Sequence, residues 1–159
     1  MRSRTFVMLK PDTVQRGLIG AIITRFEHAG LKIVGMKTVR MSPELSRKHY
    51  IEHVAKPFYK GLEHFITDGP VVAIAIEGIN AVEIVRKLIG DTEPKKALPG
   101  TIRGDFSHHS VEYSNSRDMA VKNLIHASGN EQDAKRELVL WFSPTELHEY
   151  ETVHERHVF

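Results

Sequence analysis

One run of residues limits the fold more than any other. Val71–Ile76 is continuously apolar and rich in β-branched side chains. A short apolar run of this kind is typical of a strand buried inside a sheet, because no face of it is suited to water. The segment therefore predicts a central strand, around which the rest of the chain must supply neighbouring strands and covering helices.

Strand and helix patterns alternate on both sides of this segment. Three further strands are expected, over Thr5–Leu9, Leu31–Met41 and Val121–His126. Apolar residues at helical spacing, with capping signals at several ends, predict helices over Leu18–Ala29, Pro43–Val54, Phe58–Ile66, Ala81–Ile89 and Glu131–Phe142, and a short helical turn over Pro144–His148. Asn80 is expected to cap the fourth of these helices through its side chain.

The order of these elements forms two strand–helix–strand units. It predicts an α/β (α+β) fold of the ferredoxin-like sandwich type, with a four-stranded, mostly antiparallel sheet and helices packed on one face. We expect a single domain over residues 1–159. Asp91–Arg117 has little periodicity and is expected to be a long loop, residues 107–122 an inserted loop or hairpin before the last strand, and residues 150–159 a C-terminal tail.

Composition excludes several functions. The chain has no cysteine, which excludes disulfides, thiol catalysis and cysteine-based metal sites. A net charge of +2 is too small to predict nucleic-acid binding. No apolar run is long enough to span a bilayer and the N-terminus has no signal-peptide pattern, so we expect a cytoplasmic protein without a membrane partner.

Several polar residues could bind phosphate. The glycine-rich loops that usually cradle phosphates are absent, so side chains would have to do so. Lys10 lies at the end of the first strand, Arg86 on the helix before the long loop, Thr92 after the glycine that ends that helix, and Arg103 inside the loop. Each alone is more often a surface residue, but two guanidiniums, an ammonium and a hydroxyl around one loop could neutralise a triphosphate.

The stretch Asn123–Ser128 presents an imidazole at the end of a predicted strand. If the strand is regular, His126 shares a face with Leu124 and points into the core. If the strand ends there, the following turn directs His126 into a cleft, where imidazole is well suited to act as a nucleophile near neutral pH. Glu137, about two helical turns into the last helix, could orient the ring and support positive charge on it.

Histidine pairs raise the alternative of a metal site. His49, Glu52 and His53 fit the H-x-x-E-H pattern, in which two histidines on one helix face chelate zinc. A third protein ligand is needed, and no residue stands out for that role, so we expect no protein metal ligand. His108 and His109 are an adjacent pair in the loop that we expect to be exposed.

Eight motifs together resemble the nucleoside diphosphate kinase family over nearly the whole chain. They are Arg4-Thr5-Phe6, Lys10-Pro11-Asp12, Val14-Gln15-Arg16-Gly17-Leu18-Ile19-Gly20, His49-Tyr50, Lys56-Pro57-Phe58, Gly69-Pro70-Val71-Val72, the run Pro99 to Phe106, and Asn123-Leu124-Ile125-His126-Ala127-Ser128. Each motif alone is weak, but all eight occur in the order found in the family.

The resemblance implies reversible transfer of the γ-phosphate of a nucleoside triphosphate to a nucleoside diphosphate, by a ping-pong route through a phosphohistidine. It places His126 as the nucleophile and Ser128 and Glu137 beside it. It assigns phosphate, sugar and base contacts to Lys10, Tyr50, Phe58, Leu62, Arg86, Thr92, Arg103 and Asn123. It further implies Mg²⁺ bound through the nucleotide phosphates, broad base specificity by stacking on Phe58, and a homo-oligomer, either a hexamer or a tetramer.

Three departures from the family pattern define an alternative. Gly129 stands where the family usually has aspartate, the segment between Phe106 and Asn123 is longer by roughly ten residues, and Ala120 and the tail also differ. A non-catalytic nucleotide-binding or assembly protein on the same fold would carry such changes. Retention of His126 favours the enzyme.

Overall fold

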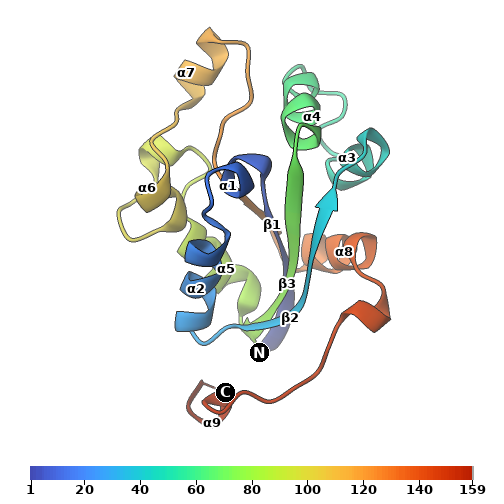
Figure 1. Ribbon diagram of the computed structural model, residues 1–159, viewed down its shortest axis with the longest axis vertical. Helices are drawn as coiled ribbons and strands as arrows, with labels where there is room; N and C mark the ends of the chain where they lie inside the picture. The colour runs from blue at the N-terminus through green and yellow to red at the C-terminus, as the bar shows by residue number, and fades with distance from the viewer. Residues whose placement is uncertain (159) are drawn as a thin grey trace.

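The computed structural model describes residues 1–158. Its sheet has four strands in the order β2-β3-β1-β4, and every neighbouring pair is antiparallel. The strands are β1 (Arg2–Leu9), β2 (Lys32–Arg40), β3 (Pro70–Ile79) and β4 (Ile125–Ala127). The predicted central strand is β3, which pairs with β1 over eight residues and also with β2. The ferredoxin-like α/β prediction is confirmed (Figure 1).

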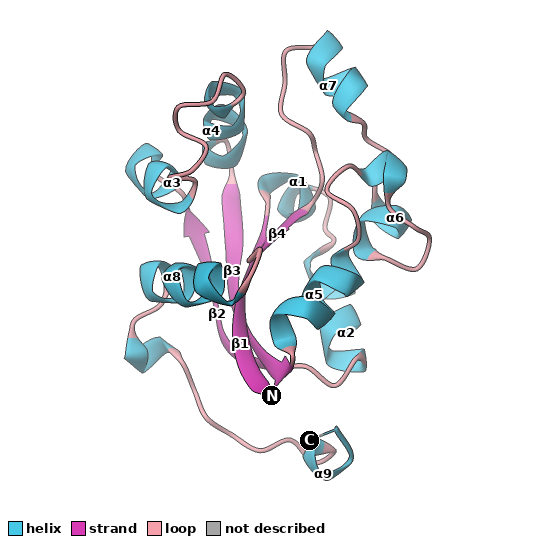
Figure 2. Cartoon of the chain, turned by 180° about the vertical axis from the view of Figure 1, so that it is seen from behind, coloured by secondary structure: helices cyan, strands magenta, loops and turns pink. Residues whose placement is uncertain are grey.

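Helices cover both faces of the sheet, so the expectation of helices on one face only is wrong. The helices are α1 (Pro11–Gln15), α2 (Ile19–His28), α3 (Pro43–His49), α4 (Tyr59–Thr67), α5 (Ala81–Ile89), α6 (Ile102–Phe106), α7 (Val111–Ser116), α8 (Glu131–Trp141) and α9 (Glu155–Val158), with 3₁₀ turns η1 (Pro94–Lys96) and η2 (Pro144–Glu146). Figure 2 shows α2 and α5 on one side of the sheet and α3, α4 and α8 on the other.

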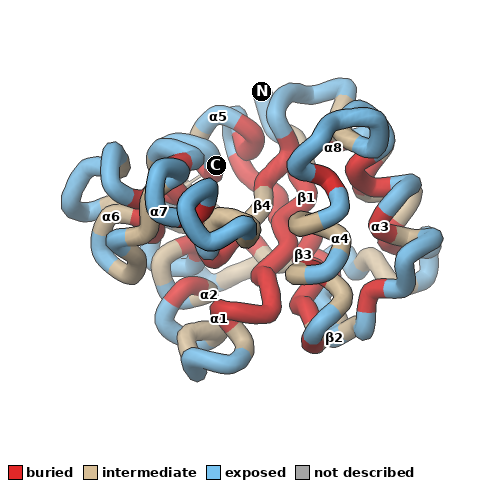
Figure 3. The backbone as a smooth tube through the Cα atoms, turned by 90° about the horizontal axis from the view of Figure 1, so that it is seen from above, coloured by how far each residue is buried: buried red, intermediate tan, exposed pale blue. Residues whose placement is uncertain are grey.

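Alternation along the strands explains the two covered faces. Val7 and Leu9 of β1 belong to the core under α2 and α5, whereas Phe6 and Met8 belong to the second core under α8. All four side chains are fully buried. Because successive side chains of a strand point to opposite faces, an apolar run with no polar position needs a cover on both. The tube in Figure 3 shows the buried sheet between exposed outer helix faces.

Side-chain caps form at the starts of α3 and α8 but not at the start of α5. Ser42 accepts a hydrogen bond from the Leu45 amide, and Asn130 accepts one of 2.8 Å from the Asp133 amide. Asn80 is the exception to the prediction: it adopts a left-handed conformation with φ +49°, and its side chain accepts a bond from the N-terminal amino group instead.

The segment expected to be a long loop contains short helices. η1, α6 and α7 lie between Asp91 and Arg117, and residues 107–122 hold helix α7 in place of a hairpin. Ser110 caps α7 through the Tyr113 amide, and the buried Glu93 carboxylate accepts a bond of 2.9 Å from the Val111 amide. Both bonds satisfy backbone amides in the first turn of α7, a helix that apolar periodicity did not predict.

Two predicted boundaries change near the site. Helix α3 ends at His49 and not near Val54, and a turn follows it. Strand β4 is Ile125–Ala127 and not Val121–His126. Leu124 has φ +71°, which a β-strand cannot accommodate, so the chain bends there before pairing with β1.

Candidate active site

The ends of β1 and β4 bring the first site residues together. His126 lies opposite Met8 in the β1–β4 pair, and the Lys10 amide donates a 2.8 Å bond to the Leu124 carbonyl. The Lys10 ammonium donates a 2.7 Å bond to the Asn123 side-chain oxygen. The bend at Leu124 separates the two faces: Leu124 and Ile125 enter the core under α5, and the His126 ring points to the α3–α8 side.

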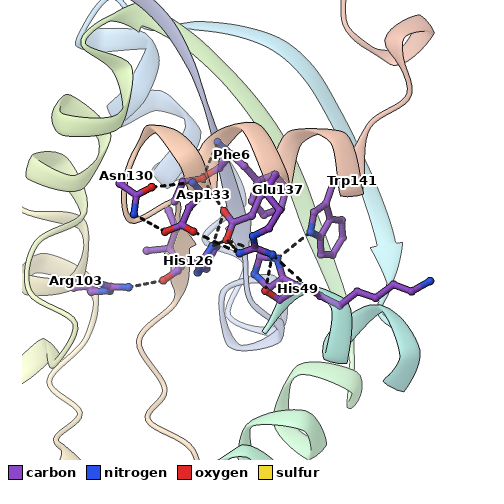
Figure 4. Close-up of polar contacts among 12 residues, drawn as sticks. Phe6, His49, Arg103, His126, Asn130, Asp133, Glu137 and Trp141 are labelled. Carbon is purple, nitrogen blue, oxygen red and sulfur yellow. Dashed lines mark hydrogen bonds and ion pairs between the residues drawn. The ribbon is translucent and has the colours of Figure 1, made fainter. Parts of the chain in front are cut away.

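His126 is held by a carboxylate from α8. Its Nε2 lies 3.0 and 3.1 Å from the two oxygens of Glu137, and the Ser128 hydroxyl donates a 2.6 Å bond to the same carboxylate (Figure 4). Ionised carboxylates only accept hydrogen bonds, so Nε2 carries the ring proton and Nδ1 keeps a lone pair. Nδ1 has no hydrogen-bond partner among residues 1–158. The histidine therefore has one nitrogen fixed and one free to react.

Burial and neighbouring cations keep this ring neutral. Removal from water, followed by the charges of Lys10 and Arg103, lowers the pKa of His126 to about 3. Burial and Arg103 likewise lower the pKa of Lys10 to about 8. The imidazole is therefore uncharged and nucleophilic at neutral pH, while the ammonium still carries its charge.

Arg103 fixes the backbone around His126. Its guanidinium donates bonds to the carbonyls of Asn123 at 3.1 Å, Ile125 at 2.6 Å and Gly90 at 3.1 Å. Burial, and then the charge of nearby Arg86, lower the pKa of Arg103 to about 10. The two predicted guanidiniums are thus close enough to repel each other, an arrangement that a phosphate would relieve.

Asn123 links the loop to this cluster. Its side-chain amide donates a 2.8 Å bond to the Thr92 carbonyl, while its oxygen accepts the bond from Lys10. The side chains of Thr92 and Arg86 are exposed. Asn123 and Lys10 are buried. Two of the predicted phosphate-binding residues are therefore held in place, and the other two are exposed to a ligand.

The three predicted base and sugar contacts lie along the 50–62 stretch. Tyr50 is buried, its ring centroid is 6.1 Å from that of His126, and its hydroxyl has no partner among the described residues. Phe58 is 55% exposed at the start of α4, and Leu62 follows one turn later, half-buried. The Phe58 ring is therefore accessible to a ligand, and its neighbours are the His53 ring, 5.6 Å away between centroids, and the Lys56 ammonium, 5.9 Å from its centroid.

The H-x-x-E-H pattern does not form the helical zinc motif. Because α3 ends at His49, His49 and His53 do not share a helix face, and the His53 Nδ1 instead lies 3.0 Å from the Lys56 ammonium. His49 turns inward, where its Nδ1 accepts a 3.1 Å bond from the Trp141 indole. Side chains that could hold a metal do gather in the described part of the chain, but they are His49, His126 and Glu137.

Two residues of α8 belong to the site although no motif singled them out. Asp133 raises the pKa of His126 against the lowering effects of burial and the nearby cations, and one of its oxygens would be 2.9 Å from a side chain added at Gly129. A carboxylate from the first turn of α8 therefore lies beside position 129, where the family usually has aspartate. Arg136 lies 3.5 Å from Glu137. Their spacing from Asn130 and Glu137 along one helix is the signal that could have found them.

A cavity of about 180 Å³ opens over the nucleophile. The arginine on its wall is Arg136; the predicted Arg86 and Arg103 do not line it. Its other walls are formed by His49, Tyr50, Glu52, His53, His126, Ala127, Gly129, Asp133 and Glu137.

No helix among residues 1–158 is long and apolar enough to cross a membrane.

A neutral histidine backed by a carboxylate, with buried cations beside it, defines an enzyme that transfers phosphate, built on a ferredoxin-like sandwich. The chain matches the nucleoside diphosphate kinase family over residues 3–147. It is 53% identical to a nucleoside diphosphate kinase of Rhodopirellula baltica over 94% of this chain and 92% of the relative, and 55% identical to one of Pyrococcus horikoshii over 92% and 89%.

Solved structures agree with this match. A transition-state mimic of nucleoside-diphosphate kinase from Borrelia burgdorferi with bound vanadate and ADP has a TM-score of 0.95 at 43% identity, covering 99% of this chain and 96% of that one. A halophilic nucleoside diphosphate kinase from Halobacterium salinarum in complex with CDP has a TM-score of 0.89 at 45% identity, covering 100% and 99%. The chain belongs to the nucleoside diphosphate kinase family, and it is therefore a phosphotransferase.

Proposed function

We propose that His126 carries the phosphoryl group between a nucleoside triphosphate and a nucleoside diphosphate. The observation that supports this most is the pair of contacts between His126 Nε2 and Glu137, which leaves Nδ1 as the nucleophile. In the first half-reaction Nδ1 attacks the γ-phosphorus, and the bond to the β-phosphate oxygen breaks, so that the diphosphate leaves. A second diphosphate then takes the phosphoryl group back from Nδ1 by the reverse path.

The surrounding charges stabilise that exchange. As the nitrogen–phosphorus bond forms, the ring becomes positive, and the Glu137 carboxylate opposite Nε2–H offsets this charge. Lys10 neutralises phosphate oxygens, and Arg103 contributes its charge while its bonds hold the backbone of the nucleophile. Arg86 and Thr92 bind the outer phosphates from the exposed side, Asn123 and Tyr50 contact the sugar and phosphates, and Ser128 fixes Glu137.

Base recognition rests on Phe58 and Leu62. A phenyl face accepts any base, because every base has a π-face, and this supports broad specificity. The similar structures from B. burgdorferi and H. salinarum hold ADP and CDP, one purine and one pyrimidine nucleotide. The enzyme would thereby balance the pools of different nucleoside triphosphates.

Magnesium fits this site as an ion bound to the nucleotide phosphates. Mg²⁺ prefers oxygen ligands and keeps several waters. Glu137 is occupied by His126 and Ser128, so the available carboxylates on the cavity wall are Glu52 and Asp133, which could accept hydrogen bonds from magnesium-bound water. Bound there, the ion would supply charge neutralisation on the phosphates.

We also propose a homo-oligomer and a cytoplasmic location, where the nucleotide substrates are abundant. Among the described residues β2 pairs as a strand with β3 alone, and the His148 amide and Tyr150 hydroxyl cover part of its outer edge through the Val34 and Ile33 carbonyls. Met36 is 54% exposed further along β2, so we infer that this end of the edge would contact a second copy. Light scattering of the purified chain would distinguish monomer, tetramer and hexamer.

The decisive experiment is uptake of the labelled γ-phosphate of ATP. The unaltered chain should become labelled, and the label should survive alkali and be lost in acid, as a phosphorus–nitrogen bond requires. His126→Ala should still bind nucleotide but take up no label, while His108→Ala, a change at an exposed histidine, should label normally. Full labelling of the His126→Ala variant would contradict the assignment.

A further inference from the structure

Three potential metal ligands meet below the cavity. Glu137 Oε1 lies 3.0 Å from His126 Nε2 and 4.0 Å from His49 Nδ1, and the ligand atoms of all three residues lie within 4.8 Å of one another. Figure 4 shows the two imidazoles converging on the Glu137 carboxylate from β4 and from the end of α3. In a tetrahedral zinc site, ligands about 2.0–2.2 Å from the metal lie about 3.3–3.6 Å apart, a range that the two observed distances bracket.

The site is built into the protein and is not a surface cluster. The side chains of His49 and Glu137 are 0% and 3% exposed, and that of His126 is 21% exposed toward the cavity. The His49 nitrogen that faces Glu137 is Nδ1, which now accepts the Trp141 indole N–H, so a metal would displace that donor. Three protein ligands with one open side toward water is the arrangement of zinc sites that keep an exchangeable position.

The ligand set is assembled before a metal binds. The facing nitrogens of both imidazoles already lie within 4.0 Å of Glu137 Oε1. Some charges around the site oppose binding of a metal cation, and others favour it. Lys10, Arg103 and Arg136 oppose a dication, and Asp133 and Glu137 favour it.

Ligand type selects the metal. Two imidazole nitrogens and one carboxylate suit Zn²⁺, Co²⁺ and related ions, whereas Mg²⁺ prefers oxygen ligands in octahedral geometry. The ion that accompanies the nucleotide should therefore not compete for this position.

We propose that His49, His126 and Glu137 form a site for Zn²⁺ or a similar transition-metal ion, and that the bound ion blocks phosphorylation of His126. The metal would take the place of the proton on His126 Nε2. In a neutral ring that proton then moves to Nδ1, so the nitrogen that attacks phosphate loses its lone pair. Metal binding itself does not depend on the function proposed above, but the block rests on it.

Cobalt provides a direct readout of the site, because four-coordinate tetrahedral Co²⁺ absorbs visible light far more strongly than the octahedral hydrated ion. We expect the unaltered chain, titrated with Co²⁺ and then Zn²⁺, to gain this absorption and lose it at one equivalent of Zn²⁺. His49→Gln and Glu137→Gln should each weaken Co²⁺ binding by at least tenfold. His53→Gln is the control, because His53 belongs to the H-x-x-E-H pattern but not to the three-residue cluster.

Two outcomes overturn the metal site: an octahedral spectrum in the unaltered chain, or tetrahedral binding that survives His49→Gln but not His53→Gln. Circular dichroism of each variant shows whether it is folded.

Trp141→Phe provides a second test, because the indole N–H now occupies the His49 Nδ1. Its removal should tighten Co²⁺ binding, and a loss of binding in the folded variant would contradict this geometry.

The block is tested separately. The zinc-loaded chain, freed of unbound metal by gel filtration, should take up label from MgATP at least tenfold more slowly than the metal-free chain, and a chelator should restore the rate. Equal rates would overturn the block. Failure of the metal-free chain to take up label would instead refute the phosphohistidine proposal and leave the cobalt result standing.

Discussion

The floor and the rim of the site are built differently. The floor consists of Lys10, Arg103, Asn123, Ser128 and Glu137, all less than a tenth exposed and all hydrogen-bonded to one another or to the backbone beside His126. The rim consists of Phe58, Arg86 and Thr92, whose side chains are exposed.

This difference separates chemistry from binding. A floor held before substrate arrives needs no reorganisation when charge develops on the imidazole, and such preorganised groups act mainly on the chemical step. In the proposed function the exposed rim residues are ordered only when nucleotide binds, so we expect them to act mainly on affinity. Floor changes should therefore lower kcat, and rim changes should raise KM.

The largest effect is expected on the floor at Glu137. Glu137→Gln keeps the size of the side chain but removes the charge that faces Nε2, so kcat should fall by about 10²–10³ with little change in nucleotide affinity. Steady-state kinetics and nucleotide titration measure the two quantities. Glu131→Gln, an exposed position at the start of the same helix, is the matched control and should change neither. A rise in KM at constant kcat would remove the distinction between floor and rim.

A smaller effect of the opposite kind is expected at Phe58. Phe58→Ala should weaken binding of every nucleotide by about 1–3 kcal/mol, or about 5- to 150-fold, and leave the rate of phosphate uptake at saturation nearly unchanged. Calorimetric titration with a purine and a pyrimidine diphosphate measures this. Loss for one kind of base alone would contradict stacking as the role of this ring, and His64→Ala on the same helix is the control.

The smallest effect is a pH limit set by the floor. Lys10 is charged below its pKa of about 8 and neutral above it, so kcat/KM should fall on the alkaline side, by about tenfold at one pH unit above that pKa. The pKa of His126, at about 3, lies too low to limit the rate near neutrality. Lys10→Arg keeps the charge and should remove the alkaline fall. The same fall in both proteins would assign it to another group.

Periodic residues explain why most of the fold could be predicted. The apolar run of β3 and the helical spacing in α2, α5 and α8 determine which elements form, and each element was found where expected. The four-stranded antiparallel sheet and the family match also agreed with the sequence-based expectation. The covering of both sheet faces was missed, because the fold was inferred from element order and not from the two-sided apolar pattern of β1.

The unpredicted parts depend on single residues and long-range contacts. The positive φ of Leu124 shortens β4 and turns His126 away from the core under α5, and no periodicity indicates it. The end of α3 at His49 directs that ring toward Trp141, which is 92 residues away in sequence. The Asp133 carboxylate comes to lie beside Gly129 only once α8 is folded.

The most direct test of the central claim is to identify the nitrogen of His126 that carries the phosphate. Phosphorus–nitrogen correlation spectra of the ¹⁵N-labelled phosphoprotein distinguish the two ring nitrogens. Because Glu137 occupies Nε2, we predict phosphate on Nδ1, with the Nε2 proton retained. Phosphate on Nε2, or on another residue, would contradict the account.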